Sequence, residues 1–508
     1  MVTATPKLLV RKDLDGFLGL FIDNLVNLLI IDATLTGLFK MDPAIVHGRI
    51  LPAAAVSILI GNLYYTLLAR RLAVAEGRSD VTALPYGIST PIMFVYLFVI
   101  MGPVYWATGD GMLAWQVGMA SALVGGIIEF LGSFVGGYIR RITPRAAMLG
   151  TLAGIAITFI AMKPTLGIWE NPLIGFVPMT IILIGFVARV AMPLHVPVGL
   201  LAVVAGTVIA WSTGFMDGAS VSRSLEQAAF HFPFPPLAEI ADGIGGVLPY
   251  LAVIIPMGVY NLLETLQNVE SASVAGDNYD TKKVMRMDGA GTLIGALLGS
   301  CFPTTVYIGH PGWKAVGARQ GYTLLNGLAL FGIGTLGLIP LVAAIVPKEV
   351  AFCILLYIGL IIGAQAVTEI PKRYAPAVLI AFLPHIAAYL KTTVDQTLLA
   401  AGSSAEALGA EKLLAAGVHY QGLDVLASGA ILTGLLLGAI VVFLVDRDFL
   451  KAALASSIGA LLAFFGIIHA TGFGIPAAPL HAGGYLFLAV VILGFHFQEE
   501  SRKKRREA

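Results

Sequence analysis

The sequence is poor in charge and in cysteine. Of its 508 residues only 12% are charged, against about 25% in soluble domains, while 57% are hydrophobic. Its two cysteines, Cys301 and Cys353, both fall inside apolar segments, so no disulfide framework is expected. No group of His, Cys and Glu has the spacing of a zinc site, and neither a P-loop nor a GxSxG motif occurs. We therefore expect no enzyme, no catalytic residue, no metal or cofactor, and no nucleic-acid partner.

Long apolar runs are abundant. Segments of roughly twenty apolar residues, the length that spans a bilayer, recur from end to end. About sixteen are expected, the last two near 452–471 and 483–497. Polar residues precede the first segment directly, so no cleavable signal peptide is expected. The composition predicts a polytopic helical membrane protein.

Basic residues predict the orientation. The clusters "RRITPR", "KKVMR", "PKR" and "RKKRR" all fall on one side when both termini are cytoplasmic. This predicts an integral, multi-pass protein of the bacterial inner (plasma) membrane, whose basic tail touches lipid headgroups. The two longer loops, 215–245 and 391–425, are then external and are expected to form short surface helices.

Two apolar segments are interrupted by proline and glycine. They are "DVTALPYGISTPIMFVYLF", with Pro85, Gly87 and Pro91, and "GSCFPTTVYIGHPGWKAVG", with Pro303, Gly309 and Pro311. Each is expected to start as a β-like stretch and to become helical after its last proline. Upstream, "NLVNLLIIDATLTG" and "NLLETLQNVESAS" form a second similar pair. Paired interrupted segments predict an inverted repeat with a midplane binding site, although chance similarity between apolar helices would also give such matches.

The stretch "YNLLETLQNVESASVAGD" (260–277) carries a polar stripe. Asn261, Glu264, Gln267 or Asn268, and Ser271 share one helix face. A charged carboxylate at the bilayer centre costs about 2.5–3.5 kcal/mol, so Glu264 is expected to exchange a proton as its surroundings alternate between wet and closed. The alternative is a carboxyl that only hydrogen-bonds neighbouring backbone. Glu270 points elsewhere, which favours capping or snorkelling.

Both interrupted segments are expected to expose backbone N–H groups where their half-helices begin. Aromatic rings and free amides there suit a flat, hydrogen-bonding solute. His310 is expected to share a proton with Glu264 or to contact the ligand, with a merely structural role as the alternative. The expected lining residues are Tyr86, Gly87, Ile88, Ser89 and Thr90, and Thr304, Thr305, Val306, Tyr307, Ile308, Gly309 and His310.

Other polar residues in apolar segments have no assigned function. Asp23 and Asp32 lie in the first span, and Asp32 needs a partner that the sequence does not identify. Glu129 is interpreted as structural, paired with Arg140 or Arg141.

Four stretches resemble nucleobase permeases of the uracil/xanthine, nucleobase–ascorbate and adenine/guanine/hypoxanthine types. "GSCFPTTVYIGHPGWKAVGARQGY" is similar to their tenth segment and "NLLETLQNVESASVAGD" to the eighth helix, where one acidic residue holds the base. "ALPYGISTP" resembles the broken third helix of the purine branch, and "VAFCILLYIGLIIGAQAV" the twelfth helix. The similarity runs from about residue 14 to 446.

The resemblance implies an all-α polytopic membrane fold with two inverted seven-helix repeats, 14–222 and 245–447. Short strands precede broken helices 3 and 10, and a core domain moves against a gate domain. Two additional helices (448–498) and a basic cytoplasmic tail (499–508) would follow. Members of these families dimerise through their gate domains, so a homodimer is expected.

The implied function is secondary active transport of a purine-like nucleobase by an elevator-type mechanism. Coupling to protons is expected, with Na+ as the other candidate, and Glu264 and His310 as the coupling residues. The residues expected to bind substrate are Glu264, Gln267, Asn268, Tyr86, Gly87, Ser89, Tyr307, Ile308, Gly309 and His310. Leucine at Gly309 is expected to block binding by crowding the site.

One departure weakens this interpretation. The second acidic or amide residue that the family carries on its tenth segment is absent, and Gly309 or His310 stands near it. The alternative is an anion transporter, sulfate- or bicarbonate-like, on the same fold, although an ionised Glu264 would repel an anion. A channel or non-transporting receptor is a third class, and a channel would need a continuous polar pore.

Overall fold

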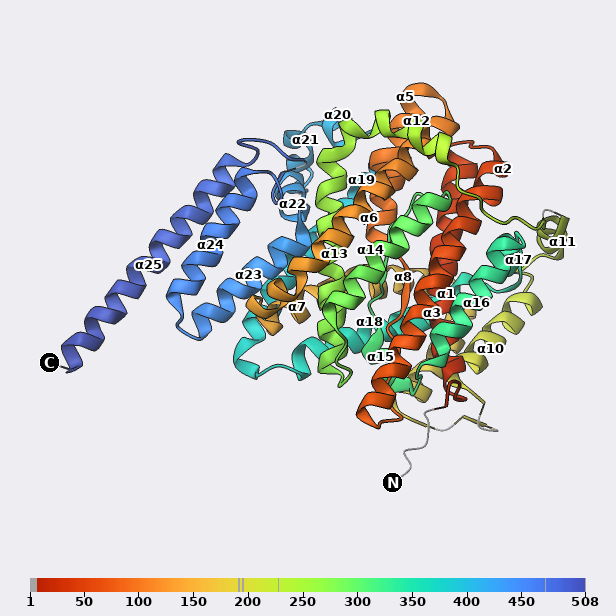
Figure 1. Cartoon of the computed structure of the whole chain (residues 1–508), viewed down its shortest axis with the longest axis horizontal. Helices are drawn as coiled ribbons and strands as arrows, with labels where there is room; N and C mark the ends of the chain where they lie inside the picture. Colours follow the sequence, from red (N-terminus) through yellow and green to blue (C-terminus); the bar gives the residue numbers. More distant parts are fainter. Residues whose placement is uncertain (1–6, 191, 194–195, 227, 471, 508) are drawn as a thin grey trace. The chain divides into compact units, whose positions relative to one another are not determined.

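A computed structural model describes residues 7–190, 192–193, 196–226, 228–470 and 472–507 (Figure 1). The chain divides into two compact units. The first comprises Met1–Gly137 and Ile160–Ile362, and the second Tyr138–Phe159 and Gly363–Ala508. We describe each unit by itself.

The helices identify an integral, multi-pass membrane protein. Within the described residues, eight helices are long and apolar enough to cross a bilayer, or up to ten if each of two bent pairs is one span. They are Asp13–Gly37, Pro43–Glu76, Thr90–Thr108, Gly111–Ile142, Arg145–Glu170, Lys348–Thr368, Lys372–Ala400 and Pro479–Arg502. Three further apolar helices are shorter. The number is below the expected sixteen because several apolar segments are short or bent.

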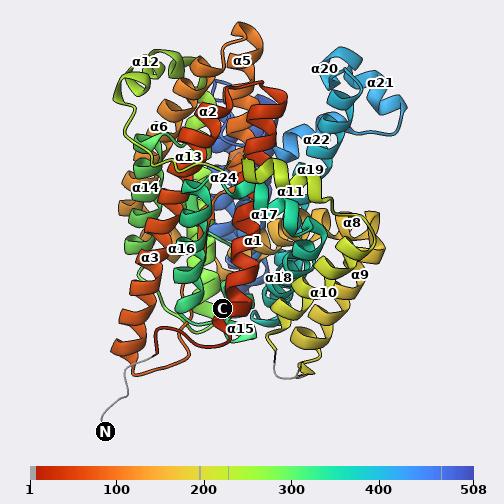
Figure 2. The same ribbon diagram turned by 90° about the vertical axis from the view of Figure 1, so that its right-hand side faces the viewer.

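The first unit begins with helices that lead to the first strand and away from it. They are α1 (Asp13–Asp32), η1 (Ala33–Leu38), α2 (Pro43–Ile45), η2 (Val46–Ile50), α3 (Leu51–Glu76), α4 (Thr90–Val95), η3 (Tyr96–Met101), α5 (Gly102–Thr108) and α6 (Gly111–Ile142). Next come α8 (Lys163–Glu170), α9 (Pro172–Ile182), η5 (Leu183–Val187), α10 (Val198–Ser212), α11 (Gly218–Glu226) and α12 (Leu237–Val247). Helices α9 and α10 run side by side (Figure 2).

The rest of the unit contains the second strand and the helices on either side of it. Its helices are η7 (Leu248–Tyr250), α13 (Leu251–Val274), α14 (Thr281–Leu298), α15 (His310–Val316), α16 (Gly321–Thr335), α17 (Ile339–Ile345) and α18 (Lys348–Thr368). Helix α3 packs along α16 and α14, and α1 packs along α16. Close packing needs small residues: a Cβ on Gly334 would lie 2.5 Å from Ala55 Cβ.

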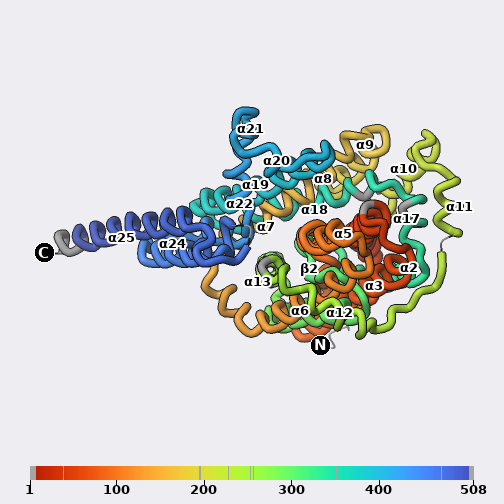
Figure 3. The backbone as a smooth tube through the Cα atoms, turned by 90° about the horizontal axis from the view of Figure 1, so that it is seen from above, coloured from red at the N-terminus to blue at the C-terminus, as the bar shows by residue number. Residues whose placement is uncertain are grey.

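Two short strands join the interrupted segments. Strand β1 (Tyr86–Ile88) pairs antiparallel with β2 (Thr304–Val306), with Gly87 opposite Thr305. Helices α4 and α15 each begin one residue before a proline, because a proline in the first turn removes no helical hydrogen bond. The expected short strands before broken helices are therefore confirmed, and each helix starts slightly earlier than expected. Figure 3 shows β2 among the helices of this unit.

The second unit is entirely helical within its described residues. It contains α7 (Arg145–Ile155), η4 (Ala156–Met162, at the boundary), η8 (Lys372–Tyr374), α19 (Ala375–Ala400), α20 (Ala405–Leu408), α21 (Ala410–Ala415), α22 (Tyr420–Ala427), α23 (Ala430–Val445), α24 (Phe449–Phe464) and α25 (Pro479–Glu507). Helices α24 and α25 run side by side (Figures 1 and 3). The expected surface helices of loops 215–245 and 391–425 correspond to α11 and α12, and to α20–α22.

Gly291→Ala is expected to destabilise the strand region. A Cβ at Gly291 would lie 1.8 Å from the Tyr86 hydroxyl oxygen and 3.1 Å from Thr304 Oγ1. Overpacking of this kind costs about 1–3 kcal/mol, so the melting temperature of the purified protein should fall. Gly245→Ala on exposed α12 meets no atom within 4 Å and is the matched control, with an expected gain of about 0.5–1 kcal/mol.

A second substitution tests whether the clash with Tyr86 causes the loss of stability. Tyr86→Phe removes the closest atom, so the Gly291→Ala, Tyr86→Phe double variant should melt above Gly291→Ala alone. Equal melting temperatures for Gly291→Ala and the wild type would show that Tyr86 does not pack against α14 in this way.

Candidate functional site

The polar stripe of α13 faces strand β2. The Asn261 amide donates to Thr304 O (3.2 Å), and the Asn268 amide donates to Val306 O (2.7 Å). A two-stranded ribbon leaves its outer carbonyls without partners, and the membrane interior offers no water to satisfy them. The amides on α13 supply these hydrogen bonds, which explains part of the polar stripe.

Helix α1 does the same for β1. The Asn24 amide lies 3.4 Å from Tyr86 O, and the Asn27 amide donates to Ile88 O (3.3 Å). Alternate carbonyls of each strand are thus met by asparagines of one helix. The arrangement matches the paired similarity between "NLVNLLIIDATLTG" and "NLLETLQNVESAS" in the sequence.

Glu264 points into the protein. It is 4% exposed, and its Oε2 accepts a hydrogen bond of 2.9 Å from Ser89 Oγ. Ser89 directly precedes α4, so this bond joins α13 to the first interrupted segment. No lysine, arginine or histidine of the described chain forms an ion pair with Glu264. The site therefore contains a buried carboxyl group held by a neutral donor.

Gln267 lies one turn along the same helix and is 1% exposed. Neither its Oε1 nor its Nε2 has a hydrogen-bond partner, and Asn261 Oδ1 also lacks one. Buried amides are costly to leave unpaired. The α13 face therefore keeps a free donor and a free acceptor beside Glu264, which a bound polar molecule would satisfy.

The two tyrosines expected to contact substrate bond across the strands. Tyr307 OH donates to Ile88 O (2.7 Å) and accepts from the Asn27 amide (2.7 Å). Tyr86 OH lies 2.6 Å from Thr304 Oγ1. Gly87 permits the close approach, because a Cβ there would lie 2.6 Å from Tyr307 Cζ. The hydroxyl groups of both tyrosines already have protein partners, and Ile308 is buried next to Tyr307.

Asp288 on α14 is a functional candidate that the sequence reasoning missed. Its carboxylate accepts hydrogen bonds from Thr265 Oγ1 (2.6 Å), Thr305 Oγ1 (3.2 Å), Val306 N (2.9 Å) and the Tyr65 hydroxyl. Four donors satisfy this carboxylate, which fixes β2 to three helices. Its signal in the sequence was an aspartate inside the apolar run "MDGAGTLIGALL".

Two other carboxylates find neutral or histidine partners. Glu129, which is expected to pair with Arg140 or Arg141, accepts a hydrogen bond from Thr292 Oγ1 (3.0 Å) on α14. Asp32 Oδ1 lies 2.7 Å from His47 Nε2, which is the partner that the sequence did not identify. Both contacts join helices that are separated along the chain.

His310 does not bond to Glu264. Its Nε2 lies 3.0 Å from Asp277 Oδ2 and 3.1 Å from Thr82 O. Asp277 also accepts from Lys314 Nζ (2.5 Å), Arg78 (3.1 Å) and Thr82 N (3.0 Å). We call Asp277, His310, Lys314, Arg78 and Thr82 the Asp277 cluster. It ties the α13–α14 loop to the chain before β1 and to α15.

The charge of Asp277 is set by this cluster. Burial acts to raise its pKa, but the hydrogen bond and charge of His310, together with the Lys314 ammonium and the Thr82 N–H, lower it to about 2. Asp277 is therefore ionised at every physiological pH, and the cluster links both interrupted segments through a permanent charge.

Gly309 adopts a positive φ of 131° at the start of α15. A Cβ there would lie 2.9 Å from Trp313 Nε1 and 3.2 Å from Ile358. Leucine at this position would strain the backbone and displace Trp313 whether or not a ligand is bound. The Gly309→Leu substitution therefore cannot report on ligand binding alone.

A cavity of about 710 Å³ lies within the first unit, and none of the residues that line it belongs to the Glu264 face of α13. Its walls come from the start of α1, the end of η5 and the segment after it, the end of α15, and α18. Arg11, Lys12 and Arg189 line it, against the single carboxylate of Asp15, which accepts from Gly199 N (2.7 Å). The cavity is thus positively charged.

Comparison with known proteins adds little to this geometry. No protein-family model and no curated protein matches the chain. Among solved structures, the transmembrane domain of a cyanobacterium bicarbonate transporter, BicA, is similar with a TM-score of 0.44 and 17% identity, covering 75% of this chain and 96% of that one. The murine anion transporter Slc26a9, in its inward-facing state, is similar with a TM-score of 0.38 and 13% identity, covering 72% and 71%. Both likenesses are weak and carry no argument about substrate.

Proposed function

We propose that the protein is a secondary transporter of a purine-like nucleobase. The observation that carries the proposal is that Glu264 and the amide of Gln267, which has no hydrogen-bond partner, lie on one buried face of α13. A carboxylate accepts a ring N–H, and a primary amide both donates and accepts. Together these groups complement the adjacent N–H and C=O groups of an oxopurine, and they lie beside the two interrupted segments.

The same carboxyl group is the proposed proton carrier. Glu264 is buried, has a serine hydroxyl as its partner, and faces no basic residue in the described chain. An uncompensated carboxylate is costly in the membrane, so protonation and substrate binding both stabilise the site. We assign proton coupling to Glu264 alone. His310 belongs to the Asp277 cluster, so we do not assign it the coupling role that the sequence led us to expect.

The proposed transport cycle is alternating access of the elevator type. The strands with α1, α3, α13 and α14 form a tightly hydrogen-bonded group that can move as one body. The positively charged cavity lies between α1 and α15 on one side and η5 and α18 on the other. The two inverted repeats, 14–222 and 245–447, the homodimer and proton rather than Na+ coupling remain predictions.

The alternative is an anion transporter. Its supporting observation is the cavity lined by Arg11, Lys12 and Arg189, whose positive charge would attract anions. Against it, Glu264 places a carboxyl group at the proposed site. A protonated Glu264 would remove this objection, so uptake measurements must decide between the two.

Uptake by reconstituted proteoliposomes tests the proposal. Radiolabelled hypoxanthine, uracil, sulfate and bicarbonate are compared with and without an inward proton gradient. We expect uptake of hypoxanthine. The proton gradient should accelerate this uptake, and an excess of unlabelled purine should reduce it by competition. Sulfate or bicarbonate uptake without hypoxanthine uptake would establish the anion alternative, and no uptake of any solute would count against both.

A further inference from the structure

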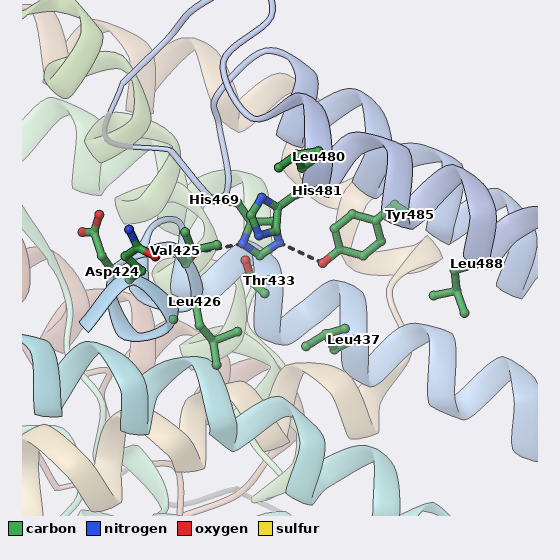
Figure 4. A pocket seen from close by; sticks show the side chains of 13 residues that line it. Asp424, Val425, Leu426, Thr433, Leu437, His469, Leu480, His481, Tyr485 and Leu488 are labelled. Carbon is green, nitrogen blue, oxygen red and sulfur yellow. Dashed lines mark hydrogen bonds between the residues drawn. The ribbon is translucent and has the colours of Figure 1, made fainter. Parts of the chain in front are cut away.

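A second cavity lies within the second unit, apart from the proposed transport site. It measures about 890 Å³ and lies between α22, α23, the α24–α25 loop and the first turns of α25 (Figure 4). This volume is within the range of about 300–1,000 Å³ typical of small-molecule sites. The two helices that follow the predicted repeats help to build it.

One end of the cavity is polar. His469 Nδ1 lies 2.9 Å from Val425 O, and because a carbonyl only accepts, Nδ1 carries the proton. The neutral ring then accepts at Nε2 from Tyr485 OH, at 3.0 Å. His481 stands beside the His469 ring, with 5.2 Å between ring centroids (Figure 4). The backbone of His469 has a positive φ of 64°, so these contacts hold a strained residue in place.

At this end of the cavity the hydroxyl group of Thr433 lacks a hydrogen-bond partner. Thr433 lines the cavity and is 0% exposed. Threonine hydroxyls in helices ordinarily bond to a carbonyl of the preceding turn, as Thr151 does to Ala147 O (2.8 Å). A buried hydroxyl left unpaired costs about 1–3 kcal/mol, which a bound polar group would recover.

The other end of the cavity is apolar and faces lipid. Leu437 lies on α23 one turn beyond Thr433, and Leu488 lies on α25 one turn beyond Tyr485. Leu488 is 37% exposed, and in a bilayer such a residue contacts acyl chains. The lining thus changes from polar to apolar along the direction of the helices, as the lining of a site for an amphiphile does.

The charges of the lining do not favour an anionic headgroup. No lysine or arginine lines the cavity, and the Asp424 carboxylate at its polar end is already paired with Lys391 (3.5 Å). Burial lowers the pKa of His469, the Val425 hydrogen bond opposes this effect, and His481 lowers the pKa further, which favours an uncharged ring. A phosphate group would therefore find no cation in the lining, and the nearby Lys391 ammonium is already paired with Asp424.

We propose that this cavity binds an uncharged membrane lipid whose head carries hydroxyl or carbonyl groups. The head bonds to the Thr433 hydroxyl and to His481 beside the His469–Tyr485 pair, and the chain lies along Leu437 and Leu488. Diacylglycerols and isoprenoid quinones share this chemistry. The two additional helices thereby form a lipid site on the lipid-facing side of their unit.

Photocrosslinking to the full-length protein in nanodiscs tests the proposal. Three lipid probes are used, each with a diazirine in its hydrophobic chain. Two are uncharged, an analogue of dioleoylglycerol and an analogue of an isoprenoid quinone. The third is an analogue of the anionic lipid phosphatidylglycerol. We expect one or both neutral probes to label peptides within 421–437 and 480–488, with phosphatidylglycerol labelling them no more than the rest of the surface. The neutral probe that labels more strongly identifies the source.

Gly484→Leu is the blocking variant. Gly484 lines the cavity, and a Cβ added there would meet no atom within 4 Å, so leucine fills space without displacing the fold. Gly494→Leu, on the same helix with equally open space, is the matched control. Labelling should fall about tenfold in Gly484→Leu, the change for 1.4 kcal/mol of binding energy, and stay unchanged in Gly494→Leu. Thr433→Val should also reduce it.

Melting temperatures of the variants show whether a loss of labelling comes from lost binding or from unfolding. Both glycine variants are expected to melt with the wild type, so lost labelling cannot be ascribed to unfolding. Equal labelling of Gly484→Leu and Gly494→Leu, or preferred labelling by phosphatidylglycerol, would overturn the proposal. Hypoxanthine uptake by Gly484→Leu is measured in parallel, because the lipid site stands whether or not the transport proposal does.

Discussion

Glu264→Gln should abolish proton-coupled uptake while leaving the protein folded. The substitution preserves the size of the side chain and can keep a hydrogen bond to Ser89, but it removes the exchangeable proton and the negative charge. A hydrogen bond to a charged group contributes about 1.5–3 kcal/mol, so hypoxanthine affinity should fall by about tenfold or more. The measurement is hypoxanthine uptake by proteoliposomes, with and without an inward proton gradient.

The control is Glu270→Gln on the same helix. Glu270 is 4% exposed, so it is buried as deeply as Glu264 and does not snorkel to the surface as expected. It is not part of the proposed substrate site, so its amide variant should keep gradient-driven uptake. Sulfate uptake by Glu264→Gln distinguishes the nucleobase proposal from the anion alternative. In an anion transporter, removing a carboxylate from the site would leave the rate of sulfate uptake unchanged or increase it. If the proton gradient accelerates hypoxanthine uptake by Glu264→Gln as much as it accelerates uptake by the wild type, Glu264 is excluded as the proton carrier.

The sequence predicted the local features of the site well. Helical spacing alone placed Asn261, Glu264 and Asn268 on one face, and the prolines marked where each helix begins. These features depend on residues close together in the chain. The short strands before the broken helices followed from the family resemblance, whereas their antiparallel pairing is visible only in the structure.

The contacts that complete the site depend on long-range packing and were not predictable. Asp288 meets Tyr65 from a distant helix, and Asp32 meets His47 across a turn. Periodicity says which face of a helix is polar, but not which helix lies against it. For this reason the sequence leaves His310 as a proton-sharing partner of Glu264, a ligand contact or a structural residue, and only the structure shows that its Nε2 faces Asp277 and Thr82.

The Asp277 cluster connects stability to the site. Because Asp277 accepts from the chain before β1 and from α15 at once, its loss should loosen both interrupted segments. Its side chain is 0% exposed, whereas that of Asp80, which pairs with the same Arg78 (2.9 Å), is 52% exposed. Buried and exposed ion pairs with a shared partner can thus be compared directly.

Asp277→Asn should lower both the melting temperature and the uptake rate. Removing one partner of a buried ion pair costs about 3–5 kcal/mol, and the partly exposed Lys314 and Arg78 place this case at the lower end. Asp80→Asn, the control, should cost about 1 kcal/mol or less because solvent screens its pairs. The two melting temperatures, measured in one detergent, test the difference.

The acid limb of the stability curve provides an independent test. The pKa of Asp277 is lowered from 3.8 to about 2, so its contribution is fully present above pH 3.8 and is lost as the pH falls toward 2. The gap in melting temperature between the wild type and Asp277→Asn should therefore be constant from pH 8 to about 5 and narrow below about 4. A gap that does not change with pH, or that is no larger than the gap for Asp80→Asn, would show that the carboxylate charge does not hold the two segments together.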